Sequence, residues 1–271
     1  MKEPASAVNR LAWWIDREIG HSEDFETLAY MGATDIRFGT FFFAAIKCDY
    51  KFLVPSARNS VSGNVSLLRA CYCTKVFVTA DMAKKFPDLE KNIPDLRNFF
   101  LVSLDDLLTG TSAHDPYDKT HAEGVKDPVL ICHTSGSTGA PKPIILPNGA
   151  FNVIDNQHRL SKLEGRKNMD YSLFDLQGKG FINTFPGFHV GGIVAMTALP
   201  IWYDSLVVMV PSNRPANGEI MGQIMSQMPI RGVFKTPTVL EELLDTPEGL
   251  KQILQTDFVM ETSSPSRGRP Y

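Results

Sequence analysis

Residues 131–142 read Ile131-Cys132-His133-Thr134-Ser135-Gly136-Ser137-Thr138-Gly139-Ala140-Pro141-Lys142. An apolar run over 128–132 precedes the loop and predicts a buried strand, and the chain becomes apolar again at 144–146. The seven residues from Thr134 to Ala140 are all small or hydroxylated, so they cannot pack a core. Their glycines allow close approach of the backbone to a ligand, and their amide and hydroxyl groups can bind an anion. Because Lys142 adds a positive charge, this composition favours a polyphosphate ligand.

Two other interpretations of this loop are weaker. Stretches rich in serine, threonine and glycine are often flexible linkers, but a linker separates polar segments and this loop lies between two apolar runs. The loop is not a Walker P-loop either, because the spacing G-x-x-x-x-G-K-[ST] is absent. The sequence therefore predicts an anion-binding loop of another kind.

On both sides of the loop, segments with strand-like and helix-like patterns alternate, which is typical of an α/β fold with mostly parallel sheets. We expect strands over residues 25–30, 51–54, 75–79, 99–102, 128–132, 144–146, 181–185, 206–210, 232–235 and 258–260. We expect helices over residues 8–19, 35–48, 60–70, 103–109, 148–162, 192–199, 218–228, 236–244 and 248–255. The segment 192–199 is apolar on all sides, so we expect it to be buried. Residues 81–96 are charged and interrupted by Pro87 and Pro94, and are expected to form either a kinked helix or a surface connection. Residues 110–126 and 163–180 are polar and punctuated by proline or glycine, and are expected to be loops.

Composition excludes several classes of function. The chain has 271 residues and a net charge of −3 without a basic block, so nothing indicates nucleic-acid binding. The N-terminal segment lacks the apolar core of a signal peptide, and the longest apolar runs are shorter than the ~18 residues of a membrane span. The four cysteines do not have zinc-site spacing, which favours free thiols in a reducing compartment and a cytoplasmic protein; they are Cys48, Cys71, Cys73 and Cys132.

The stretch from Thr134 to Gly139, with Pro141 and Lys142, resembles the phosphate loop of the adenylate-forming (AMP-binding) superfamily, which includes acyl-CoA synthetases, luciferases and peptide-synthetase adenylation domains. The resemblance extends from about residue 8 to residue 260. It is strongest toward the adenylation domain of fungal NRPS-like enzymes of the carboxylic acid reductase type. The segments that carry it are 13–15, 25–32, 35–38, 44–47 and 55–60.

This resemblance implies the large N-terminal subdomain of an adenylate-forming enzyme, built from stacked, mostly parallel sheets with flanking helices. It also implies a reaction in which Mg²⁺-ATP and a carboxylic acid give acyl-AMP, and the acyl group then passes to the phosphopantetheine thiol of a carrier domain. Lys142 would neutralise the departing pyrophosphate, and Thr138 is the one candidate contact to Mg²⁺. The residues that would surround the ATP phosphates are Thr134, Ser135, Gly136, Ser137, Thr138 and Gly139.

The resemblance implies an acyl pocket lined by Phe188, His189, Gly191 and Gly192. Alternatives remain open for the larger side chains. The flanking glycines favour the pocket for His189, but it can also be a hydrogen-bonded core histidine, and Phe188, like Phe185, can be plain core. Lys235 ends a predicted strand, where parallel sheets place ligands, but it can also be a surface lysine.

The family pattern continues beyond residue 260 with a Tyr-Gly-x-Thr-Glu motif that holds adenine and Mg²⁺, an aspartate that holds the ribose, and a small domain with a catalytic lysine. None of these occurs here. We therefore expect residues 1–260 to be a partial AMP-binding domain, shortened at both ends, followed by a disordered tail over 261–271. The fragment is expected to be inactive alone. The alternatives are a non-catalytic phosphate-binding or interaction remnant and, less compatible with the loop spacing, another nucleotide-binding α/β enzyme.

Overall fold

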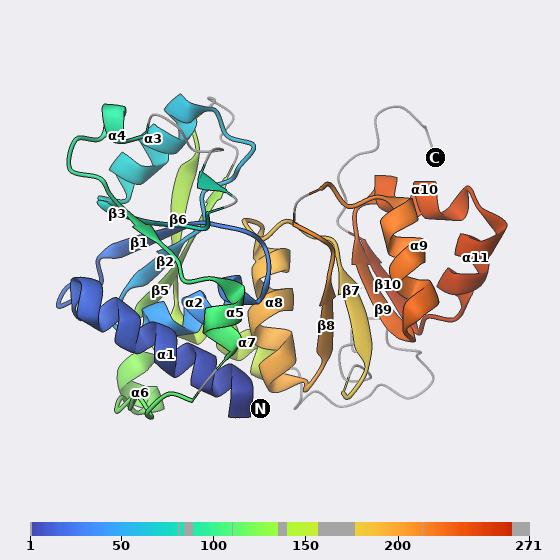
Figure 1. Ribbon diagram of the computed structural model, residues 1–271, viewed down its shortest axis with the longest axis horizontal. Helices are drawn as coiled ribbons and strands as arrows, with labels where there is room; N and C mark the ends of the chain where they lie inside the picture. Colours follow the sequence, from blue (N-terminus) through green and yellow to red (C-terminus); the bar gives the residue numbers. More distant parts are fainter. Residues whose placement is uncertain are drawn as a thin grey trace. The chain divides into compact units, whose positions relative to one another are not determined.

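The computed structural model describes residues 2–80, 82–83, 89–109, 111–134, 140–156, 177–212 and 214–261. The chain divides into two compact units, Met1–Val153 and Ile154–Tyr271, and each contains one sheet with helices on its faces (Figure 1). The predicted α/β class with parallel sheets and flanking helices is confirmed. The last described strand ends at Glu261, the residue at which the predicted tail begins, so the strand is one residue longer than predicted. The rest of that tail lies outside the described residues, so the division of the chain at residue 260 stays a prediction.

The sheet of the first unit has six strands in the order β4-β3-β1-β2-β5-β6. Its first five strands in sequence are parallel, and β6 returns antiparallel to β5. The strands are β1 (Thr27–Met31), β2 (Lys51–Leu53), β3 (Lys75–Val78), β4 (Arg97–Phe100), β5 (Pro128–Thr134) and β6 (Lys142–Pro147). The helices are α1 (Lys2–Ile19), α2 (Ile36–Lys47), α3 (Val61–Ala70), α4 (Leu89–Asn92), α5 (Leu104–Leu108), α6 (His121–Gly124), the 3-10 helix η2 (Asn148–Phe151) and α7 (Asn152–Asn156).

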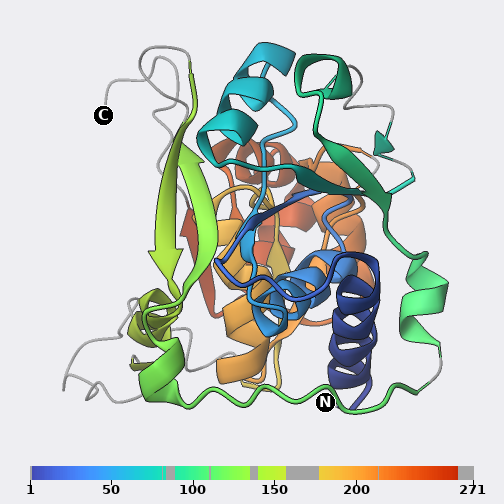
Figure 2. The same ribbon diagram turned by 90° about the vertical axis from the view of Figure 1, so that its left-hand side faces the viewer.

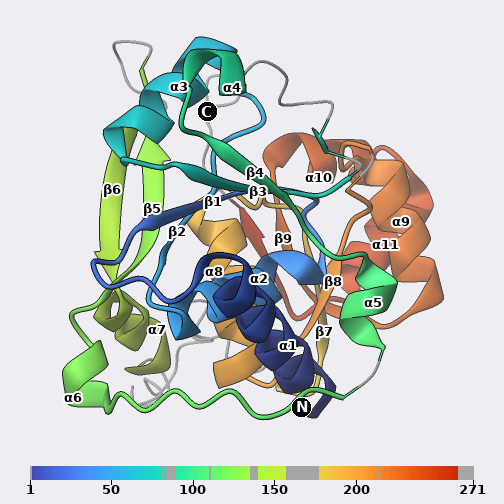
Figure 3. The same ribbon diagram turned by 60° about the vertical axis from the view of Figure 1, so that its left-hand side comes forward.

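Successive side chains along each strand point to opposite faces of the sheet, which divides the core of the first unit into two layers. Ala29 and Met31 of β1 face α3 and α4, in one apolar cluster with Leu67 and Leu68. Tyr30, between them in sequence, faces the opposite side and joins the phenylalanines of α2. Figure 3 shows α1 and α2 on one side of this sheet and α3 and α4 on the other.

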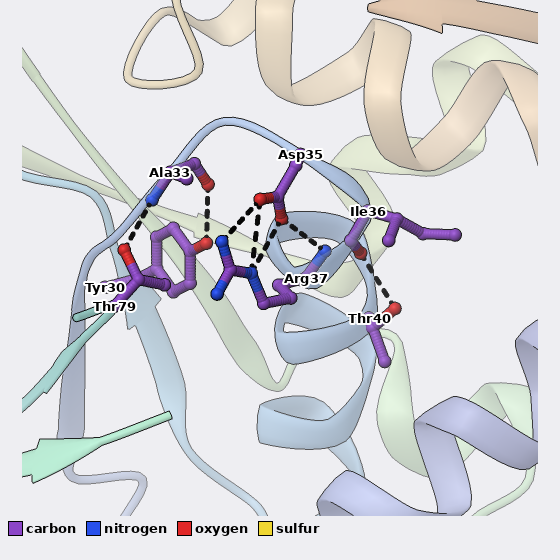
Figure 4. A network of polar contacts seen from close by, with 7 residues as sticks. All are labelled: Tyr30, Ala33, Asp35, Ile36, Arg37, Thr40 and Thr79. Carbon is purple, nitrogen blue, oxygen red and sulfur yellow. Dashed lines mark hydrogen bonds and ion pairs between the residues drawn. The ribbon is translucent and has the colours of Figure 1, made fainter. Parts of the chain in front are cut away.

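A polar network fixes the turn that leads from β1 into α2 (Figure 4). The Tyr30 hydroxyl donates to the carbonyl of Ala33 at 2.6 Å, and the amide of Ala33 donates to Thr79 Oγ1 at 3.0 Å. Asp35 then begins α2 as its N-cap, accepting from the Arg37 amide at 2.9 Å and pairing with the Arg37 guanidinium at 2.6 Å. The turn is therefore tied to β3 as well as to its own helix.

Two lysines anchor the irregular segment before β5: Lys47, which pairs with Asp115 at 3.5 Å, and Lys119. Lys119 Nζ donates to Asp49 at 2.5 Å and to Asp127 at 2.8 Å, and it lies 4.9 Å from the centre of the Phe25 ring. Partial burial opposes the charged form of Lys119, but the hydrogen bonds to Asp127 and Asp49 outweigh it and raise the pKa of the ammonium. These contacts hold the predicted surface connection against the first unit.

The sheet of the second unit has the order β10-β9-β7-β8, with all neighbours parallel. One face packs on a single long helix, α8, and the other on α9, α10 and α11. Its strands are β7 (Gly180–Asn183), β8 (Leu206–Met209), β9 (Ile230–Lys235) and β10 (Phe258–Glu261). Its helices are α8 (Val190–Trp202), α9 (Gly218–Gln227), α10 (Pro237–Leu244) and α11 (Pro247–Leu254).

Several expectations need correction or completion. Helix α1 begins at Lys2, six residues before its predicted start, and the short helix α4 lies inside the predicted segment 81–96. β4 begins at Arg97, two residues before the predicted start, because it is the edge strand of its sheet and carries exposed polar residues. The predicted connection 110–126 contains the one-turn helix α6, which has a capping box between Thr120 and Glu123. The apolar helix α8 is not buried on all sides: Val190 is 52% exposed and Ile201 is 49% exposed.

The predicted free thiols are confirmed. All four cysteines are free, and three of them, Cys48, Cys71 and Cys73, are buried. Burial raises the pKa of Cys48 and of Cys73 to about 12 and that of Cys71 to about 11. Since the thiolate is the reactive form, these three side chains are inert core residues.

Candidate functional site

The predicted phosphate loop joins β5 to β6, at the edge of the first sheet where the parallel strands end. Thr134 is the last residue of β5 and Lys142 is the first residue of β6, and the two are cross-strand partners. Both are exposed. The other predicted phosphate contacts, Ser135, Gly136, Ser137, Thr138 and Gly139, lie outside the described residues. The two flanks are thus close together, with Lys142 opposite Thr134 at the loop end of the β5–β6 pair.

No pattern in the sequence connects this loop with the segment that follows β2. Because β2 and β5 are neighbouring parallel strands, their carboxyl ends meet at the same edge of the sheet. The amide of Ser56, in that segment, donates to His133 Nε2 at 3.2 Å. His133 precedes the loop directly, so the segment after β2 contacts its entry point; the 77-residue separation of Ser56 and His133 hides the contact from local patterns.

The predicted acyl-pocket residues gather at the start of α8, after the end of β7. His189 is the N-cap residue of α8 and is exposed, so it is not a core histidine. Phe188 is half-buried, with its ring centre 5.8 Å from that of His189. Phe185, by contrast, is only 6% exposed and stacks on Phe234 at 5.8 Å, so it belongs to the core.

The two glycines of this segment have a packing role. A Cβ on Gly192 would lie 2.2 Å from the carbonyl oxygen of Pro186, and a Cβ on Gly191 would lie 3.1 Å from Phe185 Cδ2. The turn 186–189 therefore folds directly onto the first turn of α8. Because of this close packing, the turn, with His189 as its last residue, lies directly against the start of α8.

Lys235 is fully buried at the carboxyl end of β9, which excludes the surface-lysine alternative. β9 is an inner strand, covered on its two sides by β7 and β10. Neither ordinary strand composition nor spacing distinguishes such a lysine from an exposed one.

The phosphate-loop flanks belong to the first unit and the α8 residues to the second. Among the described residues, no group of three or more histidine, cysteine, aspartate or glutamate side chains could hold a metal ion. In the same part of the chain, no helix combines the length and the apolar character that a membrane crossing requires.

Comparison with known families gives a match over almost the whole chain. The family described as "AMP-binding enzyme" matches residues 2–263. A carboxylic acid reductase from Neurospora crassa is 28% identical over 257 residues, which are 94% of this chain and 24% of that protein. An isocyanide synthase-NRPS hybrid from Aspergillus fumigatus is 26% identical over 265 residues, which are 96% of this chain and 17% of that protein.

Solved structures agree on the fold. The ATP-bound MatB of Rhodopseudomonas palustris superposes with a TM-score of 0.75 at 14% identity, covering 97% of this chain and 49% of that one. The o-succinylbenzoate CoA synthetase of Bacillus subtilis, in complex with its acyl-adenylate intermediate, superposes with a TM-score of 0.70 at 15% identity, covering 97% of this chain and 62% of that one. The chain thus spans about a quarter or less of these curated relatives and about half of these structural neighbours.

Proposed function

Because the chain belongs to the AMP-binding enzyme family, we propose that it supplies the phosphate-binding part of an adenylation domain, which converts a carboxylic acid and ATP to acyl-AMP within a longer protein. The observation that carries this proposal is the β5–β6 hairpin. It places Thr134 beside Lys142 where the parallel strands of the first sheet end, with both residues exposed and the predicted phosphate loop between them.

The donors on this edge fit a polyphosphate and not a metal cluster. Lys142 supplies a point charge for the departing pyrophosphate, and the residues from Thr134 to Gly139 supply hydroxyl and amide donors. Mg²⁺, when bound with ATP, would neutralise charge on the phosphate oxygens, and Thr138 is the candidate contact from this chain. The contribution of the protein is positioning and electrostatic stabilisation during displacement at the α-phosphate.

For the second substrate we propose a carboxylic acid held near the start of α8. His189 is exposed there, and the N-terminus of a 13-residue helix favours a negative charge. The acyl group would then pass to the phosphopantetheine thiol of a carrier domain, a partner consistent with relatives named as a carboxylic acid reductase and an NRPS hybrid. The free thiols support a reducing, cytoplasmic setting.

The isolated chain is expected to catalyse no carboxylate-dependent exchange between ATP and pyrophosphate. The adenine, ribose and catalytic-lysine motifs of the family pattern are not in its sequence. The measurement is isotope exchange with a panel of aryl and aliphatic acids, with and without Mg²⁺. Exchange well above the no-acid background would show that the chain catalyses adenylation alone. It would contradict the proposal that the chain acts only within a longer protein.

Lys142→Ala is expected to weaken pyrophosphate binding by about 1–3 kcal/mol, or roughly 5- to 150-fold, the range for a hydrogen bond to a charged group. Wild-type affinity is expected near ~1 mM, with ATP, GTP and pyrophosphate competing similarly, because the loop contacts phosphate and not base. Calorimetric titration of both proteins tests this. Lys251→Ala is the matched control, since it removes an exposed lysine from α11 of the other unit. Equal binding by wild type and Lys142→Ala, or selectivity for ATP over GTP, would contradict the assignment.

A further inference from the structure

We propose that His133 is a positioning residue for the phosphate loop, and that its neutral imidazole holds residues 56–64, here called the frame segment, against the end of β5. This inference rests on the proposed polyphosphate function of the loop. It assigns a role to a residue that lies outside the predicted phosphate contacts.

The contact between His133 and the frame segment fixes the form of the imidazole. The amide of Ser56 donates to His133 Nε2 at 3.2 Å. A neutral imidazole has one donor and one acceptor nitrogen, so Nε2 must carry the lone pair and the ring proton must be on Nδ1. Ser56 is only 4% exposed, so its amide has little access to water as a substitute acceptor.

Ser56 begins the frame segment and forms hydrogen bonds with three other residues of it. Its Oγ accepts from the Arg58 amide at 3.1 Å, and its carbonyl accepts from the Asn59 amide at 3.1 Å and from Asn64 Nδ2 at 3.4 Å. The Asn59 and Asn64 side chains are joined in turn at 2.9 Å. The bond to His133 therefore positions a rigid segment and not a single loose residue.

The frame segment also contacts the other flank of the loop. Gly63 lies in the first turn of α3, and a Cβ added to it would be 3.6 Å from Pro141 Cδ. Figures 2 and 3 both show α3 beside the ends of β5 and β6. The entry of the loop at His133 and its exit at Pro141 thus meet the same segment. A loop whose two ends are fixed loses less conformational freedom when it binds a ligand, which increases affinity.

Protonation would remove this support. An imidazolium carries a hydrogen on Nε2, so it would place a second donor opposite the Ser56 amide. The charged residues on the elements around His133 are Lys51 of β2, Arg58 of the frame segment, Arg69 of α3 and Lys142 of β6. All four are cationic.

The experiment compares wild type with His133→Gln and His133→Leu by calorimetric titration with inorganic pyrophosphate at pH 7.5. Glutamine keeps an acceptor for the Ser56 amide and leucine does not. We expect His133→Leu to lose about 3- to 10-fold in affinity, the range for one neutral hydrogen bond, and His133→Gln to stay within about 2-fold of wild type. His21→Gln is the control, because it removes an exposed histidine elsewhere in the first unit.

A second titration at pH 5.5 distinguishes a positioning role of His133 from direct contact of His133 with the phosphate. This titration needs only wild type and His133→Gln, so it does not depend on the folding of the leucine variant. Relative to His133→Gln, which experiences the same protonation of the ligand, wild type should lose affinity on acidification. A gain would make His133 a cationic phosphate ligand and overturn the inference, as would equal binding by all three proteins at both pH values. If wild type does not bind pyrophosphate at all, both the proposed function of the loop and the positioning role of His133 are wrong.

Discussion

Phe52→Ala is expected to destabilise the first unit by about 3–5 kcal/mol, the range for truncating a fully buried phenylalanine. Phe52 is 0% exposed, and its ring centre lies 5.3–5.9 Å from those of Tyr30, Phe38, Phe41 and Phe42. Removing the ring leaves a cavity that four large aromatic neighbours cannot close, and it also removes the edge-to-face contacts with Phe38 and Phe42. Urea unfolding followed by near-ultraviolet circular dichroism, which reports on ordered aromatic packing, measures the loss.

Phe100→Ala is the matched control for this prediction. Phe100 ends the edge strand β4 and is 65% exposed, so its truncation should change the free energy of unfolding by less than about 0.5 kcal/mol. Similar losses in the two variants would mean that the aromatic cluster around Phe52 is not the core of the first unit.

Local signals in the sequence predicted most helix boundaries. Asp35, Ser60 and Ser103 were expected to begin helices, and each is an N-cap whose side chain accepts a backbone amide. The same chemistry was overlooked at Thr120, where the spacing to Glu123 is a capping-box signature but no apolar run follows to draw attention to it. Caps are predictable because donor and acceptor lie within one turn.

Burial was harder to predict than secondary structure. Lys235 and His189 each follow an apolar strand, yet the structure buries the first completely and exposes the second. The difference arises from sheet order, because β9 lies between β7 and β10, whereas His189 stands at the exposed beginning of α8. Sheet order depends on contacts between distant segments, which one sequence does not reveal.

The sequence also predicted one part of the candidate site and missed another. The motif located Thr134 and Lys142, and the structure makes them cross-strand partners. Residues 55–60 entered the family resemblance and residues 60–70 were predicted as a helix, but no pattern connected the frame segment with the loop, since serine and asparagine are ordinary in turns and helix caps. Its connection with His133 requires β2 and β5 to be adjacent, and this is a property of the folded sheet.

Gly192→Ala is expected to destabilise the second unit by about 3 kcal/mol, at the upper end of the range for overpacking. The added Cβ would lie 2.2 Å from the carbonyl oxygen of Pro186 and 3.1 Å from that of Phe185. Both obstacles are backbone atoms of the turn that leads into α8, so relief requires the turn to separate from the helix. His189 would move with that turn, and any carboxylate site at the start of α8 would be lost together with stability.

Gly191→Ala provides the comparison within the same helical turn. Its Cβ would meet the edge of the Phe185 ring at 3.1 Å, and a side chain can shift by the few tenths of an ångström required. The better helix propensity of alanine, up to about 1 kcal/mol over glycine, offsets part of that cost. Thermal and urea melts of the two variants should therefore differ by about 2 kcal/mol or more. If Gly192→Ala unfolds no more easily than Gly191→Ala, the turn 186–189 does not pack on α8 as closely as the structure shows.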